Sequence, residues 1–334
     1  MGQFGANLYV MKDFAAIESS RPFARLGMLS GIILAYGFYM HLYQQMRWSK
    51  PSESMSEAAF WSSWQARLEL DFSIAPTSEL GKTRLHHKHF GPLRIQKALY
   101  PEGASPCHAI IVHPPGGIAA GDQLEVQVAC EVGSHGLVTT PSAAKWYGAE
   151  SDTVASQQID MTLDGYFEWL PQETIVFNRA RVVSDIAIRV SAQGATIGWD
   201  HLIFGRQASG ETFAEGNFKQ TLRLDVDGDL VWLDRMVLQG SDPLFASPIG
   251  LRGHFAFATI WAVLPGDKEW GEAALQTLRL EAKGVAWTVL HQRVVVGRIL
   301  APAMDIKLLL QAAWMSLRPI VLERPAVAPR LWAT

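Results

Sequence analysis

Three carboxylates stand among apolar or glycine residues, where a charged side chain needs a stabilising partner. Asp122 follows Gly-Ile-Ala-Ala-Gly, Asp200 follows Thr-Ile-Gly-Trp, and Asp234 lies between Val-Trp-Leu and Arg235. Burial of an ionised carboxylate costs free energy unless the group is paired or hydrogen-bonded. Taken singly, each is best explained as structural, with Asp122 capping its loop and Asp234 paired with Arg235. Taken together, they offer oxygen ligands for a hydrophilic passage for a divalent cation, although they do not resemble a closed metal cage.

The densest histidine cluster is His86-His87-Lys88-His89. Neutral imidazole is a ligand for nickel and zinc, so an exposed metal site is one interpretation. On a strand, His87 and His89 would share a face and His86 would point the other way. Because Lys88 adds a repelling positive charge and no carboxylate is near in the sequence, a solvated surface is the favoured interpretation.

A glycine-rich segment, His113-Pro-Pro-Gly-Gly-Ile-Ala-Ala-Gly-Asp122, follows the apolar run Ala109–Val112. Backbone N–H groups of such a loop can stabilise an anion, as in a hydrolase oxyanion hole. A hydrolase of that kind also needs a nucleophile elbow, and Gly-x-Ser-x-Gly does not occur in the sequence. Since proline and glycine also build tight chain reversals, a turn is favoured and a hydrolase stays the alternative.

The elements that must position these side chains are predicted to be mainly strands. Apolar residues alternate with polar ones, a period typical of half-buried strands. This pattern covers Glu125–Cys130, Gln158–Leu163, Ile186–Val190 and Thr221–Val226. Asp227-Gly228 then predicts a hairpin, because glycine adopts positive φ at little cost.

Helical spacing of apolar residues is rarer. It predicts one helix within Lys268–Lys283 and another over Asp305–Arg318, which Pro319 is expected to end. The fold class is therefore mainly β, with a single large β-rich domain and a few helices over residues 64–334.

Composition excludes several classes of protein. The 334 residues are 49% hydrophobic and carry a formal net charge of −3, which gives no electrostatic footprint for nucleic acid. Two cysteines, Cys107 and Cys130, are too few for a disulfide framework and are typical of a reduced, cytoplasmic protein.

Residues 1–63 form an apolar N-terminal extension that differs from the rest. Leu26–Tyr43 has 18 residues without a formal charge, at the lower limit for a transmembrane helix. Three interpretations stay open: a start set too far upstream, with Met55 as the true start; a membrane anchor; or an amphipathic arm. The anchor would make the chain a membrane-tethered β-rich binding protein.

Ten segments, taken in order, resemble the urease accessory proteins of the UreD (UreH) family. Their order and spacing match from Trp64 to the end, which makes the resemblance specific. The extension is atypical of the family, and Ala120 stands where glycine is common. The segments are Trp64–Leu70, Gly81–Thr83, Gly91–Lys97, Tyr100–Gly103, His113–Asp122, Thr139–Tyr147, Glu168–Thr174, Phe204–Phe213, Trp314–Pro319 and Pro329–Thr334.

The resemblance implies a non-enzymatic, β-rich scaffold for urease maturation. It would join a UreF-like partner and a UreG-like GTPase, which hydrolyses the GTP, and dock on the urease apoprotein. No tightly bound cofactor is expected; nickel would be in transit through a water-filled tunnel. Asp122, Asp200 and Asp234 resemble positions on that polar route, although the last is commonly glutamate in the family.

The C-terminal segment Trp314–Thr334 offers few metal ligands. Trp314 and Trp332 are expected to act as large apolar anchors, in the core or at a partner interface. Arg318 and Arg330 complete the predicted partner interface.

Overall fold

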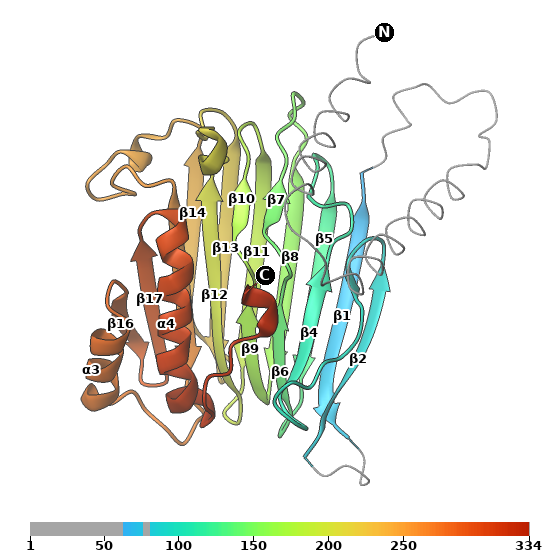
Figure 1. Cartoon of the computed structure of the whole chain (residues 1–334), viewed down its shortest axis with the longest axis vertical. Coiled ribbons are helices and arrows are strands. Elements are labelled where there is room, and N and C mark those ends of the chain that lie inside the picture. Colours follow the sequence, from blue (N-terminus) through green and yellow to red (C-terminus); the bar gives the residue numbers. More distant parts are fainter. Residues whose placement is uncertain (1–62, 76–80, 334) are drawn as a thin grey trace, which may run out of the picture. The chain divides into compact units, whose positions relative to one another are not determined.

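The computed structural model describes residues 63–75 and 81–333 (Figure 1). The predicted extension, with its apolar stretch Leu26–Tyr43, therefore lies outside the described residues except for Ser63. In the described part of the chain, none of the helices combines the length and apolar character needed to cross a membrane. The described part is mainly β, as predicted.

Two sheets lie face to face, and the side chains on their inner faces pack against each other. The first sheet has the strand order β14-β13-β11-β8-β5-β1-β2. Its strands are β1 (Gln65–Ile74), β2 (Thr83–Phe90), β5 (Gln123–Cys130), β8 (Ala155–Leu163), β11 (Arg181–Val190), β13 (Asn217–Val226) and β14 (Asp229–Gln239).

The second sheet has the order β16-β17-β15-β12-β9-β6-β4-β3, with β10 beside β12 and β7 beside β10. Its strands are β3 (Arg94–Ile95), β4 (Cys107–Val112), β6 (His135–Thr139), β7 (Ala144–Trp146), β9 (Tyr166–Leu170), β10 (Thr174–Val176), β12 (Ala195–Phe204), β15 (Ala256–Val263), β16 (Ala286–His291) and β17 (Val294–Leu300).

The chain passes repeatedly between the two sheets. β5 is followed by β6 in the other sheet, and β8, β9, β11, β12 and β13 continue this exchange. Neighbouring strands β1, β5, β8, β11 and β13 consequently run parallel. Parallel strands need a crossover connection, and here strands of the other sheet provide it instead of helices. The edge strands β2 and β14 pair antiparallel with β1 and β13.

Side chains of the second sheet alternate between two hydrophobic cores, one between the sheets and one under the helices. On β12, Leu202 and Phe204 face the first sheet, whereas Ile197 and Trp199 face the opposite way, toward α4. Side chains two residues apart on a strand share a face. Asp200 therefore points between the sheets, into the core that Leu202 belongs to.

The predicted hairpin at Asp227-Gly228 is confirmed. It joins β13 to β14, and Asp227 and Gly228 both have positive φ, 55° and 89°. Two consecutive residues with positive φ match the twist of the flanking strands.

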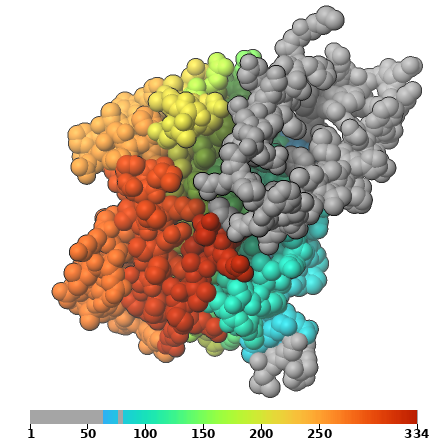
Figure 2. Space-filling model, viewed as in Figure 1, coloured from blue at the N-terminus to red at the C-terminus, as the bar shows by residue number. Residues whose placement is uncertain are grey.

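A helical layer covers the outer face of the second sheet. The helix predicted within Lys268–Lys283 is found as α3 (Glu272–Glu281), which packs beside α4. Single turns of 3-10 helix also occur, at Gln207–Ser209, Pro243–Phe245 and Arg330–Ala333. In the space-filling view, α4 and the C-terminal segment form the surface over this sheet (Figure 2).

The helix predicted over Asp305–Arg318 is found as α4 (Ala303–Leu322), which packs on β12 and β15. The prediction that Pro319 ends this helix is wrong, because Pro319 lies inside it. An internal proline costs about 3 kcal/mol. Val321 and Leu322 are buried beyond it, and burial of two such side chains stabilises by a comparable amount.

Candidate functional site

A cavity of about 240 Å³ lies between the two sheets and extends to the loop after β4 and to the segment before β7. Most of its wall is the apolar inner face of the sheets. Several polar atoms in a space of this volume are enough to hold water. The polar side chains that line it include His113, Lys145, Gln157, Ser184, Asp200 and Gln220.

Asp200 is the sole carboxylate among the described residues that line this cavity. Gln220 on β13 donates a hydrogen bond from Nε2 to Oδ2 of Asp200, over 2.8 Å. Burial raises the pKa of Asp200 to about 6; the Gln220 hydrogen bond and the Arg298 charge lower it, whereas the Asp234 charge adds to the rise. Because it borders the cavity, Asp200 remains partly accessible to water.

Asp234 pairs with Arg298, not with Arg235 as predicted. Arg298 Nη2 lies 2.6 Å from Asp234 Oδ2. Neighbouring residues on a strand point to opposite faces, so Asp234 faces inward while Arg235 faces outward. Arg298, on β17 of the other sheet, also donates from Nη1 to Thr259 Oγ1 over 2.8 Å. Asp234 is not among the residues that line the cavity.

Asp122 caps its own loop, as predicted. Its two carboxylate oxygens accept hydrogen bonds from the backbone N–H groups of Trp64 and Ala119, each over 2.8 Å. The residue is buried and is absent from the cavity wall. Asp122 is thus a loop cap outside the cavity wall.

The segment after β4 makes tight chain reversals. Gly116 N–H donates to the His113 carbonyl over 2.9 Å, and a Cβ on Gly117 would lie 2.3 Å from the Tyr147 ring. Within the described residues, His113 Nε2 has no hydrogen-bond partner. Burial lowers the pKa of His113, and the nearby Asp122 opposes that shift. The hydrogen bond from Gly116 N–H to the His113 carbonyl supports the turn interpretation.

The histidine cluster lies on the edge strand β2. His87 and His89 stack with ring centroids 6.4 Å apart, and His86 lies on the other face with Nδ1 3.7 Å from Asp71 Oδ2. Burial, with the charges of the neighbouring histidines, lowers the pKa of His87. Among the described residues, no group of three or more histidine, cysteine, aspartate or glutamate side chains is arranged to hold a metal ion.

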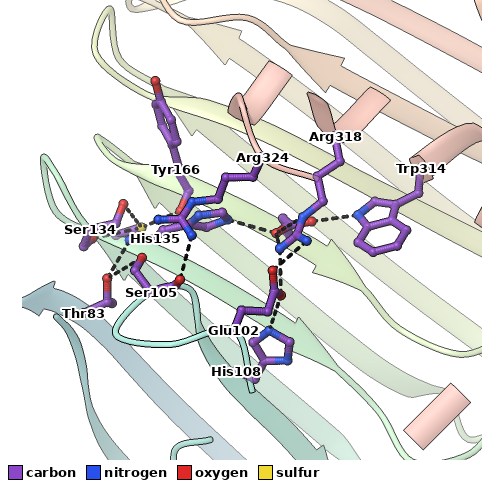
Figure 3. A network of polar contacts seen from close by, with 12 residues as sticks. Thr83, Glu102, Ser105, His108, Ser134, His135, Tyr166, Trp314, Arg318 and Arg324 are labelled. Carbon is purple, nitrogen blue, oxygen red and sulfur yellow. Dashed lines mark hydrogen bonds and ion pairs between the residues drawn. The ribbon is translucent and has the colours of Figure 1, made fainter. Parts of the chain in front are cut away.

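A second buried polar region lies between the second sheet and α4 (Figure 3). Arg318 donates to Glu168 Oε1 from Nη2 over 3.1 Å and to Glu102 Oε2 from Nη1 over 2.8 Å. Trp314 Nε1 donates to the other Glu168 oxygen over 2.7 Å. His135 Nε2 lies 2.9 Å from Glu168 Oε1. This network joins α4, β9 and the loop before β4.

Burial opposes ionisation of both carboxylates in this network. Hydrogen bonds from His108 and Arg318 outweigh it and lower the pKa of Glu102 to about 2. Interactions with His135, Arg318 and Trp314 similarly lower the pKa of Glu168. Both glutamates are therefore ionised at neutral pH, and Arg318 is a charged partner of both.

The predicted partner interface at the C-terminus is corrected for three of its four residues. Trp314 and Arg318 are fully buried, and Trp332 is only 7% exposed. The Trp332 ring packs on Trp314 with centroids 5.3 Å apart. Of the two roles expected for the tryptophans, both have the core role, and Arg318 is buried with them. Arg330 is exposed, and its part in an interface stays a prediction.

Residues 65–333 match the model of a protein family described as UreD urease accessory protein. The chain belongs to the UreD family. A protein named urease accessory protein UreD from Janthinobacterium sp. (strain Marseille) is 41% identical, over 81% of this chain and 92% of the relative. One of the same name from Dechloromonas aromatica (strain RCB) is 39% identical, over 81% of this chain and 95% of the relative.

Two residues of this UreD protein were not singled out from the sequence, although a signal was present. Glu168 interrupts the run Tyr-Phe-Glu-Trp-Leu, and Arg298 interrupts Val-Val-Val-Gly-Arg-Ile-Leu. A charged residue inside a continuous apolar strand must find a partner in the fold. Such a signal locates the charge but does not identify its partner.

Proposed function

We propose that this UreD protein is a scaffold in urease maturation that passes nickel toward the urease apoprotein. In this proposal it acts in the cytoplasm, in a complex with a UreF-like protein and a UreG-like GTPase, and the GTPase hydrolyses the nucleotide. Membership of a family of urease accessory proteins supports the role in maturation. Nickel is cargo here, not a resident cofactor.

The observation that carries the nickel route is the contact of Asp200 with the cavity between the sheets. A carboxylate surrounded by protein is unfavourable, yet Asp200 lies beside Gln220 instead of in an ion pair among the described residues. One carboxylate with amide and hydroxyl neighbours, Gln157 and Ser184 among them, binds a divalent cation weakly enough to release it.

In this proposal the three predicted carboxylates have different parts. Asp200 contacts a cation inside the cavity, and Asp234 lies beyond it toward the edge of the sandwich. Asp122 is left out of the route because both of its oxygens are used in capping.

Filling the cavity should stop nickel delivery without preventing assembly. Ser184 on β11 is buried and lines the cavity, so Ser184→Phe would place a ring in the space that water and the cation need. We expect nickel bound per urease, measured by elemental analysis after activation, to fall about tenfold or more. Co-purification with the UreF-like and UreG-like partners should persist.

Ala187→Phe is the matched control, because Ala187 lies on the same strand and faces away from the cavity. It should leave nickel delivery unchanged. A folded Ser184→Phe protein that loads urease with a normal amount of nickel would refute the route.

Removal of residues 1–54 should leave urease activation intact. The family match begins at residue 65, so the deleted part lies outside the region that relatives share. Urease activity of cells that carry the shortened protein would be compared with wild type, and membrane fractions would be probed for the full-length protein. A folded but inactive shortened protein would show that the extension is needed.

A further inference from the structure

Polar side chains continue from Asp200 toward one side of the sandwich. In the second sheet, Asp200 on β12 is paired in register with Thr259 on β15, and Thr259 with Arg298 on β17. All three point between the sheets, as their apolar neighbours on the same faces do. Strands are about 4.8 Å apart, so this row spans about 10 Å. Asp234, on the edge strand β14 of the first sheet, accepts a hydrogen bond from Arg298, the last residue of this row.

Arg298 closes this end of the row. Its guanidinium donates to Asp234 and Thr259 and lies over the Trp232 ring, 5.7 Å from the centroid. Its positive charge also acts on Asp200. A guanidinium that donates a short hydrogen bond to a carboxylate competes with a metal ion for that oxygen, and two cations in one place repel each other.

The cost of moving Arg298 is small. Its side chain is 42% exposed and that of Asp234 is 29% exposed. A solvent-accessible ion pair of this kind contributes little to stability. The fully buried pair of Arg318 and Glu168 is a different case, because breaking it would leave an uncompensated charge in the core. Arg298 can therefore leave its partners, whereas Arg318 cannot.

We propose that Arg298 is a removable counter-ion that occupies the cation position between Asp234 and Thr259, and that its displacement opens a divalent-metal site formed by Asp200, Asp234 and Thr259. The inference rests on the proposed function, and it adds the residue that controls access at this end of the route. Oxygen ligands are then supplied by two carboxylates and one hydroxyl, a set that suits a hydrated divalent cation in transit.

The test measures nickel binding to the isolated full chain, with nickel chloride alone as the probe, by equilibrium dialysis. Arg298→Met keeps an unbranched side chain over Trp232 but removes the charge. We expect its affinity for nickel to rise about tenfold or more over wild type. Arg298→Gln should act in the same direction, and addition of Asp200→Asn to Arg298→Met should remove the gain.

Arg223→Met is the matched control. Arg223 forms a similar close pair with Asp225, but on the outer face of the first sheet. Wild-type nickel affinity in folded Arg298→Met and Arg298→Gln proteins would overturn the inference, and so would an equal gain in Arg223→Met. Normal delivery by Ser184→Phe refutes the proposed function instead, since dialysis of the isolated protein does not depend on urease.

Discussion

Substitution of Arg318 by methionine is expected to lower the thermal midpoint of unfolding of the isolated protein by about 10 °C, which corresponds to about 3–5 kcal/mol. Methionine keeps an unbranched apolar stem but removes the guanidinium that contacts Glu102, Glu168 and the Pro325 carbonyl. Both carboxylates would then stay buried without the guanidinium that they share, beside His135 and His108. Removal of one partner of a buried ion pair lowers the free energy of unfolding by much more than the intact pair contributes to it.

Calorimetry or circular dichroism on heating would measure this change. Arg279→Met is the control, because Arg279 pairs with Glu272 on the exposed face of α3, and it should cost less than about 1 kcal/mol. Glutamine at both Glu102 and Glu168 should partly restore the stability of Arg318→Met, since the orphaned charges are removed. An Arg318→Met midpoint within about 2 °C of wild type would contradict the predicted importance of the network.

Asp200→Asn is expected to stabilise the isolated protein and, at the same time, to reduce nickel delivery. At neutral pH the ionised Asp200 is held in a site where burial disfavours its charge. Asparagine has a similar shape and can still accept the hydrogen bond from Gln220, but it carries no charge. A residue that costs stability and is nevertheless present is best explained by function.

The stability of the protein should depend on pH through Asp200, because its pKa rises from 3.8 to about 6 on folding. Between these values the folded state binds a proton that the unfolded state lacks, so the stability contribution of Asp200 falls as pH rises through the window. The loss is nearly complete at about pH 7 and amounts to about 3 kcal/mol. The gain from Asp200→Asn should therefore be larger at about pH 7.5 than at about pH 5.

Urea unfolding at the two pH values would measure the stability, and nickel per urease after activation would measure delivery. Asp185→Asn is the control, because Asp185 is exposed on the outer face of the first sheet and should change neither. A destabilised Asp200→Asn protein would contradict the claim that the buried charge of Asp200 lowers stability. Full nickel loading by a stable variant would remove Asp200 from the route.

Local sequence alone determined the elements and several of their details. The period-two runs became strands, and Asp227-Gly228 became the turn between β13 and β14. The cap at Asp122 was also predictable, because Ala119, one of its two partners, lies within the same loop. In each case the deciding interactions join residues close in the chain, which propensity and spacing describe well.

Only the tertiary structure decided which charges meet. Asp234 finds Arg298, 64 residues away, and Arg318 finds Glu168, 150 residues away. Sequence proximity suggested Arg235 as the partner of Asp234, and Arg318 was predicted to lie at a partner interface. Packing of the two sheets and α4 overruled both. Pro319 was overruled in the same way, because burial of Val321 and Leu322 outweighs a local preference. Long-range pairing depends on the register of strands in different sheets, and that register is a property of the whole fold.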